Sequence, residues 1–492
     1  MSKRLVKNAV VNVGRGVTSA IVAILVPPVL VRHMQPSVYG VWVLILQVVG
    51  YMGFIDFGLQ TAVGRYVAFA EQKQDNEFRD AVFSTAFAGL SLAALLGFIA
   101  IAVVALNVGS IFPSIPHSLL KPMRIAMVVA GLSVAIGLPV SAWNGVFIGL
   151  QRYEIPAGTL ALGKLLTSAG LMFAALRGKS LVYMGAVVAV LNLATYSVQF
   201  GFLRRIVPGV KFRTQMITRA TIRELSQYCA TLTIWSFSTF LIAGLDLVLV
   251  GRFEFNAVTA YSTAAVLIAF FGGLQVSIFN VIMPHAAALF AASEARALGS
   301  LLLKTTRLGF LILLFTGFPL IVCSFYIFKF WIGVQFAAQG SSILVTLVLA
   351  NILRLISVPY SSILLGTGQQ RLIIISPIME SLVNLLASVA LGLRYGAIGV
   401  AYGTLLGALV GFLFHLFYNL PRTRTYIDLS TRKLMASLLG PAGACLVPFA
   451  VALPISYFAG WNNKLTMLVA LSMSMLLSLY LAAKTFRQWN ED

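Results

Sequence analysis

The sequence predicts an all-α integral membrane protein with about 14 transmembrane helices, arranged as two parallel six-helix repeats followed by two C-terminal helices. Three observations predict it: the composition, the length of the hydrophobic stretches, and the recurrence of one pattern along the chain. Of the 492 residues, 59% are hydrophobic and only 10% are charged, whereas a soluble chain has about 25% charged residues. Together with a mean hydropathy of +0.94, this composition excludes a soluble enzyme.

Hydrophobic stretches of about 20 residues are long enough to cross a bilayer as helices. The basic N-terminus "MSKRLVKNAVVNVGRG" leads into an apolar stretch too long for a signal peptide, so we predict a retained first span. No interval between stretches could hold a soluble domain. The predicted spans cover 9–31, 38–58, 81–106, 123–149, 155–176, 180–203, 226–250, 258–283, 306–330, 341–365, 372–393, 396–419, 433–457 and 463–484.

The distribution of basic residues predicts the orientation. If the N-terminus is cytoplasmic, the inside segments carry most of the loop Lys and Arg, as the positive-inside rule requires. Both termini are therefore expected in the cytoplasm. The densest basic stretch, "LRRIVPGVKFRTQMITRATIRE", joins spans six and seven, where it would lie against anionic lipid. The net charge of +21 thus needs no nucleic acid partner.

A constant offset of 219 residues relates the two halves of the chain. It pairs "GLQR", which ends at 152, with "GQQR", which ends at 371, and it also pairs Tyr183 with Tyr402. Six spans per repeat is an even number, so both halves enter the membrane in the same direction. The predicted organisation is a lobe at 1–205, a basic cytoplasmic linker at 206–225, a lobe at 226–420, and two extra helices with a tail at 421–492. Transporters built from such repeats bind substrate between the halves.

Polar residues in the first span define a candidate binding face. Asn8, Asn12, Arg15 and Ser19 follow helical spacing and share one face, which cannot face lipid. For Arg15 alone, snorkelling to the cytoplasmic interface is the alternative. The stripe recurs in the seventh span without the charge, because Ile234 replaces Arg15.

The second span raises a question of its own, because "GYMGFIDFGLQTAVGRYVAFAE" carries Asp56 and, nine residues later, Arg65. On a straight helix these two side chains lie on opposite faces, about 13 Å apart along the axis. We therefore predict that Asp56 pairs with Arg15 on the first helix, within about 8 Å, and that Arg65 lies near lipid phosphates.

Further charges lie within the spans. Lys164 stands apart from the acidic residues of the first half and is the best single candidate for a cation that faces a ligand. Arg354 and Glu380 lie at similar depth on consecutive helices, so either a structural ion pair or a cavity-lining cation is expected. Asp246 would serve as a polar cap or in ion coupling.

The candidate site combines these residues. The predicted substrate-binding residues are Arg15, Lys164, Arg354, Asn8 and Asn12, and the predicted ion-coupling or charge-pairing residues are Asp56, Asp246 and Glu380. The excess charge is positive, which favours an anionic group such as phosphate or pyrophosphate. No metal site is predicted from the spacing of the three cysteines.

The stretch "VYGVWVLILQVVGYMGFIDFGLQTAVGRYVA" (38–68) resembles the second-span signature of Wzx-type bacterial polysaccharide flippases. These flippases belong to the multidrug/oligosaccharidyl-lipid/polysaccharide exporter superfamily. "FIGLQRYE" (147–154) and "LDLVLVGRF" (245–253) agree with the same family. The residues that carry the second-span match are Tyr39, Gly40, Trp42, Asp56, Gly58, Leu59, Arg65 and Tyr66.

The resemblance implies a V-shaped, two-lobed transporter of the bacterial cytoplasmic membrane. It would move undecaprenyl-pyrophosphate-linked oligosaccharide from the inner to the outer leaflet, for O-antigen or exopolysaccharide synthesis. A nucleotide-binding loop is absent from the sequence, so a proton or sodium gradient, or consumption by polysaccharide polymerase machinery, would drive transport. No cofactor and no enzymatic activity are expected.

Four other functions stay open. A drug/cation antiporter of the same fold would favour an acidic cavity, and a lipid II flippase would share the lipid anchor. A membrane scaffold would not need polar residues inside the bundle. An integral membrane enzyme is the least supported, because the four histidines are scattered along the chain.

Overall fold

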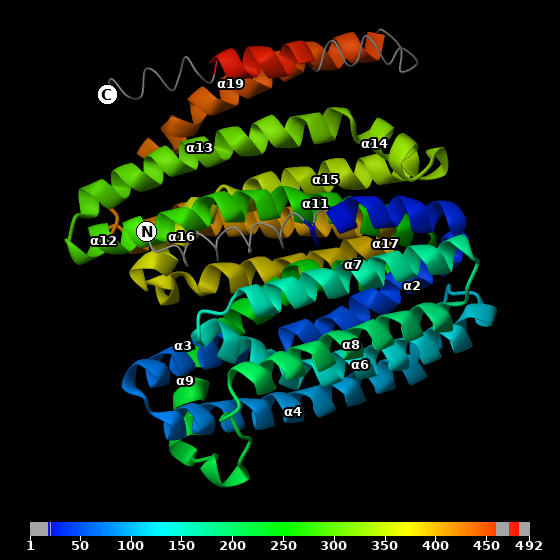
Figure 1. Cartoon of the computed structure of the whole chain (residues 1–492). Helices are drawn as coiled ribbons and strands as arrows, with labels where there is room; N and C mark the ends of the chain where they lie inside the picture. The colour runs from blue at the N-terminus through cyan, green and yellow to red at the C-terminus, as the bar shows by residue number, and fades with distance from the viewer. Residues whose placement is uncertain (1–17, 20, 459–471, 482–492) are drawn as a thin grey trace. The chain divides into compact units, whose positions relative to one another are not determined.

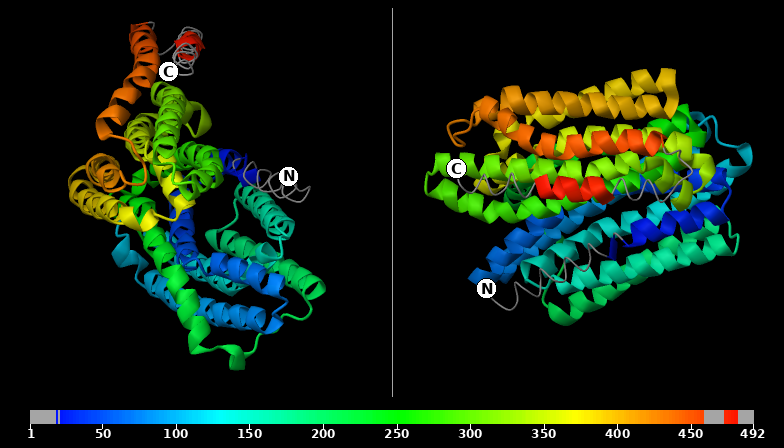
Figure 2. Two further views of the ribbon diagram at one scale, coloured as in Figure 1. Left: turned by 90° about the vertical axis from the view of Figure 1, so that its left-hand side faces the viewer. Right: turned by 90° about the horizontal axis from the view of Figure 1, so that it is seen from above.

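The computed structural model describes residues 18–19, 21–458 and 472–481 (Figure 1). All regular structure in these ranges is helical, as predicted. The chain divides into two compact units, Met1–Thr259 (unit 1) and Ala260–Asp492 (unit 2). Within each unit the long helices lie side by side, as the views of Figures 1 and 2 show.

Unit 1 is built around α6, which packs against α3, α4 and α8. Three helices begin with a side-chain cap. Asp75 accepts from the backbone N–H of Phe78 (2.9 Å) and starts α4, Ser180 starts α8, and Thr218, which accepts from the backbone N–H of Thr221 (3.2 Å), starts α9. Its helices are Ile21–His33, α2 (Pro36–Gly50), α3 (Leu59–Lys73), α4 (Asn76–Leu106), α5 (Val108–Ile111), α6 (His117–Gly149), α7 (Glu154–Leu176), α8 (Leu181–Ile206), α9 (Arg219–Thr239) and α10 (Asp246–Phe253).

Unit 2 begins with α11, whose first residues lie at the boundary between the two units. α17 covers most of two predicted spans, joined at Gly396, whose combination of φ 63° and ψ −139° only glycine adopts readily. The helices are α11 (Val258–Phe279), α12 (Met283–Ala291), α13 (Ala295–Val322), α14 (Ser324–Trp331), α15 (Ala337–Leu355), α16 (Val358–Thr367), α17 (Ile375–Phe414), α18 (Leu420–Arg422), α19 (Thr431–Phe458) and Ser472–Leu481.

The structure confirms the two repeats. The helical stretch Pro36–Lys73 recurs as Phe255–Ala291, and α4 and α13 begin 219 positions apart, at Asn76 and Ala295. Even the turns correspond, because Gln74 and Ser293, again 219 positions apart, have φ angles of 56° and 59°. A backbone detail that recurs at this offset is independent of chance matches between apolar sequences.

Within the described residues, nine helices are long and apolar enough to cross a membrane. One of them, Gln370–Arg422, contains two of the predicted spans. The remaining four predicted spans overlap Ile21–His33, α9 and α10, α19, and Ser472–Leu481. Parts of the first and of the last predicted span lie outside the described residues. The protein is thus a multi-pass membrane protein.

The second and seventh spans differ from the prediction, because neither is one continuous helix. The chain leaves α2 through a 3-10 turn at Tyr51–Phe54 and starts α3 only at Leu59. The seventh span passes through a π-helical segment, Phe240–Gly244, between α9 and α10. The straight-helix geometry assumed for Asp56 and Arg65 is therefore wrong.

Candidate functional site

Asp56 lies in the break between α2 and α3. Phe57 and Gly58 follow it with φ angles of 50° and 77°, so the chain turns away from the α2 axis at this point. The Asp56 carboxylate accepts from the backbone N–H of Gln60 and from the Ser141 hydroxyl of α6, both at 3.3 Å. Asp56 thus stabilises the first turn of α3, because the backbone N–H groups at the start of a helix lack helical partners and attract a negative charge.

The predicted partner of Asp56 cannot be compared with these contacts. Arg15, together with Asn8 and Asn12, lies outside the described residues. Their pairing and their role as a binding face therefore stay predictions.

Arg65 lies on α3 beyond the break and its side chain is exposed. Its guanidinium carbon lies 5.0 Å from the centre of the Tyr228 ring on α9 and 5.8 Å from the Tyr66 ring. Both distances fit cation–π contacts. Arg65 therefore helps to join α3 to α9 within unit 1.

The second break faces the first inside unit 1. The carbonyl of Gly244, at the end of the π segment, accepts from Gln47 Nε2 (2.8 Å) and from the Tyr51 hydroxyl. The ring of Phe240 packs edge-on against Tyr51, with centroids 4.8 Å apart. A π segment leaves some backbone carbonyls without the N–H donors of a regular α-helix. Here the side chains of Gln47 and Tyr51 replace the missing donor to the Gly244 carbonyl. Asp246, two residues further on, is buried and opens α10.

We predict that replacing Gln47 by Leu and Tyr51 by Phe together destabilises the protein. The Gly244 carbonyl is buried, and a buried carbonyl that loses its donors costs about 1–3 kcal/mol. Thermal melting of the purified protein measures the loss. Tyr183→Phe, which removes an exposed hydroxyl, is the control, and equal melting of all three proteins would contradict the role of this contact.

Lys164 lies in the middle of α7, and its side chain is exposed. Its backbone carbonyl accepts from the Ser168 hydroxyl at 2.7 Å, within the helix. The neighbouring Gly163 lets α7 approach Thr195 of α8. The packing of α7 on α8 therefore fixes the backbone from which Lys164 projects.

The structure brings Arg354 and Glu380 together. Nε of Arg354, in the last turn of α15, lies 2.5 Å from Oε1 of Glu380 on α17, and their side chains are 20% and 11% exposed. This is the structural ion pair that the sequence predicts as one of two alternatives. Because the carboxylate balances the guanidinium, Arg354 adds little net charge to its surroundings.

Glu380 begins a row of polar residues on α17, of which Asn384 and Ser388 were not predicted from the sequence. Asn384 and Ser388 follow it at four-residue intervals on the first half of α17, and the Ser388 hydroxyl donates to Asn384 Oδ1 (3.0 Å) or the Val400 carbonyl (3.1 Å). The second half of α17 faces this row with glycines. Glu380, Asn384 and Ser388 contact the backbone positions of Gly411, Gly407 and Gly403 respectively. The glycine spacing, typical of close helix contacts in membranes, is the signal that could have revealed the row.

Replacing Gly407 by Ala should destabilise unit 2. A Cβ atom at this position would lie 2.6 Å from Cβ of Asn384 and 3.0 Å from its Cα. Such overpacking costs about 1–3 kcal/mol. Gly273 of α11 is the matched control, since no atom lies within 4 Å of its added Cβ. A lower melting temperature is expected for Gly407→Ala than for Gly273→Ala, and the reverse order would refute the tight contact.

In the part of the chain that the structure describes, no three His, Cys, Asp or Glu side chains gather in a way that could hold a metal ion. The candidate site residues that the structure describes therefore do not form one cluster. Arg354 and Glu380 meet in unit 2. In unit 1, Asp56 lies in the break between α2 and α3, Lys164 lies on α7 and Asp246 lies at the start of α10.

The fold built from these helices is that of transporters of the MOP superfamily. The lipid II flippase MurJ, in an inward closed conformation, matches with a TM-score of 0.77, covering 98% of this chain and 99% of that chain at 14% identity. An inward-facing multidrug resistance MATE family transporter of the superfamily matches with a TM-score of 0.58, covering 82% and 98% at 16% identity. A mutant of the Vibrio cholerae MATE transporter VcmN gives 0.61, covering 86% and 98% at 12% identity.

The family follows from the sequence itself. The model of the polysaccharide biosynthesis protein family matches residues 5–290, more than half of the chain. The protein belongs to this family. The comparison with curated proteins gave no match.

Proposed function

We propose that the protein moves a polyprenyl-pyrophosphate-linked oligosaccharide from the inner to the outer leaflet of the bacterial cytoplasmic membrane. The observation that carries this proposal is the match to the polysaccharide biosynthesis family over residues 5–290 on a chain with a MOP transporter fold. Polysaccharide synthesis at a membrane needs a carrier for glycans made on lipid, and this fold is a carrier fold.

The charges within the membrane-spanning helices support an anionic cargo. With Arg354 paired to Glu380, we propose that Lys164 and Arg15 bind the pyrophosphate, with Asn8 and Asn12 as neutral hydrogen-bonding partners. A pyrophosphate offers several charged oxygens, which suit more than one cation. An acidic site for drug cations would need the opposite balance.

We also propose the division into lobes at 1–205 and 226–420, with a linker between them and two helices after them, and alternating access by these lobes. The two breaks joined by Gln47, Tyr51 and Gly244 are the places where the second and seventh spans can bend. Asp56 and Asp246, both beside these breaks, are the groups we propose for coupling to a proton or sodium ion. Both termini are proposed to be cytoplasmic.

A lipid II flippase is the second candidate, because the match to MurJ spans almost all of both chains. At 14% identity that match defines the fold, and lipid II shares the polyprenyl pyrophosphate with the first candidate. The two cargoes differ in the head group.

Cargo binding to the purified protein tests the proposed substrate class. Undecaprenyl-pyrophosphate oligosaccharide should raise the melting temperature, while the uncharged polyprenol and a cationic dye should not. Stabilisation by lipid II alone would favour the second candidate, and stabilisation by the dye alone would show that the cargo is a cation.

A further inference from the structure

The basic segment between α8 and α9 packs against other helices of unit 1. Val207 and Val210 are buried in the hydrophobic core that α3, α4 and α6 share. The ring of Phe212 lies 5.4 Å from that of Phe87 on α4. The segment is therefore fixed to unit 1 before α9 begins at Arg219.

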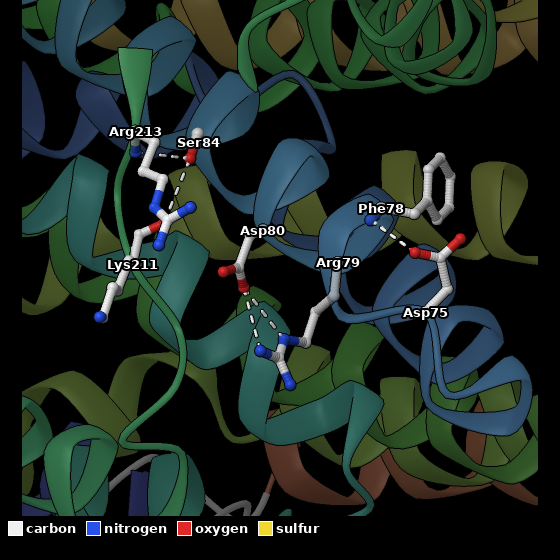
Figure 3. A network of polar contacts seen from close by, with 7 residues as sticks. All are labelled: Asp75, Phe78, Arg79, Asp80, Ser84, Lys211 and Arg213. Atoms are coloured by element: carbon white, nitrogen blue, oxygen red, sulfur yellow. Dashed lines mark hydrogen bonds and ion pairs between the residues drawn. The ribbon is translucent and has the colours of Figure 1, made fainter. Parts of the chain in front are cut away.

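A single buried serine fixes the backbone on both sides of Phe212. The Ser84 hydroxyl of α4 accepts from the backbone N–H of Arg213 (3.1 Å) and donates to the carbonyl of Lys211 (3.4 Å), as Figure 3 shows. Arg213 has extended backbone angles, φ −137° and ψ 116°. In an extended segment, residues two apart lie on the same side, so Lys211 and Arg213 form a pair of cations with a fixed backbone.

Arg79 of α4 lies near this segment but is not part of the Lys211–Arg213 pair. Arg79 donates through Nε (3.2 Å) and Nη2 (3.0 Å) to Oδ1 of Asp80, and both side chains are 10% exposed (Figure 3). A Cβ atom at Gly209 would lie 3.7 Å from Nη2 of Arg79, so the segment passes close to this side chain. The Arg79 charge is thus balanced within the fold, while those of Lys211 and Arg213 are exposed.

Two more exposed cations, Arg204 and Arg205, end the membrane-length helix α8 next to this segment. The guanidinium of Arg204 lies 5.1 Å from the centre of the Phe200 ring. Exposed Phe200 and Phe212 add apolar surface beside the cations. Aromatic rings and cations at the end of a spanning helix are typical of a surface at the level of lipid head groups.

We propose that the surface formed by Arg204, Arg205, Lys211 and Arg213, here named the linker surface, binds the phosphate of an anionic phospholipid in the leaflet on its own side of the membrane. On the predicted orientation that is the cytoplasmic leaflet. The charges are complementary, and holding the Lys211–Arg213 backbone in place before the lipid arrives lowers the ordering cost of binding. A topology signal alone requires basic residues but no such fixed geometry.

The site belongs to the first half of the chain. At the 219-residue offset, Ser430 and Thr431 stand where Lys211 and Phe212 stand in the first half. The second half therefore has neither the first cation of the pair nor the aromatic ring between the two cations.

Lipid binding to the purified full chain, measured by native mass spectrometry and by thermal melting, tests the proposal. Phosphatidylglycerol should bind the parent protein more tightly than phosphatidylcholine. Lys211→Gln with Arg213→Gln should weaken phosphatidylglycerol binding by about 30-fold, given the usual attraction of two basic side chains to an anionic surface. Ser84→Ala keeps all four cations and releases the backbone, so a smaller but measurable weakening is expected.

The control variant is Arg177→Gln with Lys179→Gln, which removes two exposed cations at the turn between α7 and α8, at the other end of α8. It should bind phosphatidylglycerol like the parent. Equal loss in both double variants would show that only overall charge matters and would overturn the proposal, as would equal binding of the two lipids. Displacement of the lipid by millimolar inorganic phosphate would identify a free-phosphate site instead. Because no glycan cargo is used, these outcomes do not depend on the proposed transport function.

Discussion

Glu380→Ala should lower the free energy of unfolding by about 3–5 kcal/mol, the usual cost of leaving one partner of a buried ion pair without the other. The Arg354 side chain is 20% exposed, so water can replace little of the lost interaction. One of its amino nitrogens, Nη2, is already buried without a hydrogen-bond partner among the described residues. The guanidinium therefore depends on a single carboxylate oxygen.

Thermal or denaturant unfolding of the purified protein measures this loss. Glu294→Ala removes an exposed carboxylate that makes no side-chain capping hydrogen bond to α13. It is the matched control and should change little. Arg354→Met combined with Glu380→Gln should recover much of the stability, because no buried charge remains. If Glu380→Ala unfolds like the control, the ion pair does not contribute to stability.

Lys164→Ala should reduce cargo movement by about 10- to 100-fold. A hydrogen bond to a charged group contributes about 1.5–3 kcal/mol, and each 1.4 kcal/mol corresponds to a factor of ten. Because Lys164 is exposed on α7, its replacement by Ala should leave the fold intact.

Two variants separate this role from a general effect of charge. Lys164→Arg keeps a cation and should retain most of the movement. Lys179→Ala removes an exposed cation at the turn after α7 and should move cargo like the parent. Full activity of Lys164→Ala would remove Lys164 from the proposed site while leaving the transport function in place.

Much of the fold could be predicted from the sequence because a membrane imposes simple rules. Length and hydropathy locate the spans, and the 219-residue offset located the repeats well enough that Asn76 and Ala295 start equivalent helices. The pair of Arg354 and Glu380 could be predicted for a related reason, since two opposite charges at one depth on consecutive helices are costly apart.

The helix breaks could not be predicted in the same way. Residues 50–58 are apolar enough to continue a helix, and the positive φ of Phe57 is not a preference of phenylalanine. The break depends on contacts with residues distant in the sequence, such as that from Ser141 to Asp56. The π segment likewise depends on donors from Gln47 and Tyr51, which periodicity does not reveal.

Transbilayer movement in proteoliposomes tests the central claim most directly. Purified protein would be reconstituted with labelled undecaprenyl-pyrophosphate oligosaccharide, and the accessibility of the label to an impermeant probe would be followed over time. We expect the protein to accelerate the appearance of cargo in the opposite leaflet relative to protein-free vesicles. No acceleration with this cargo or with lipid II, together with export of a cationic dye from the same vesicles, would contradict the flippase function.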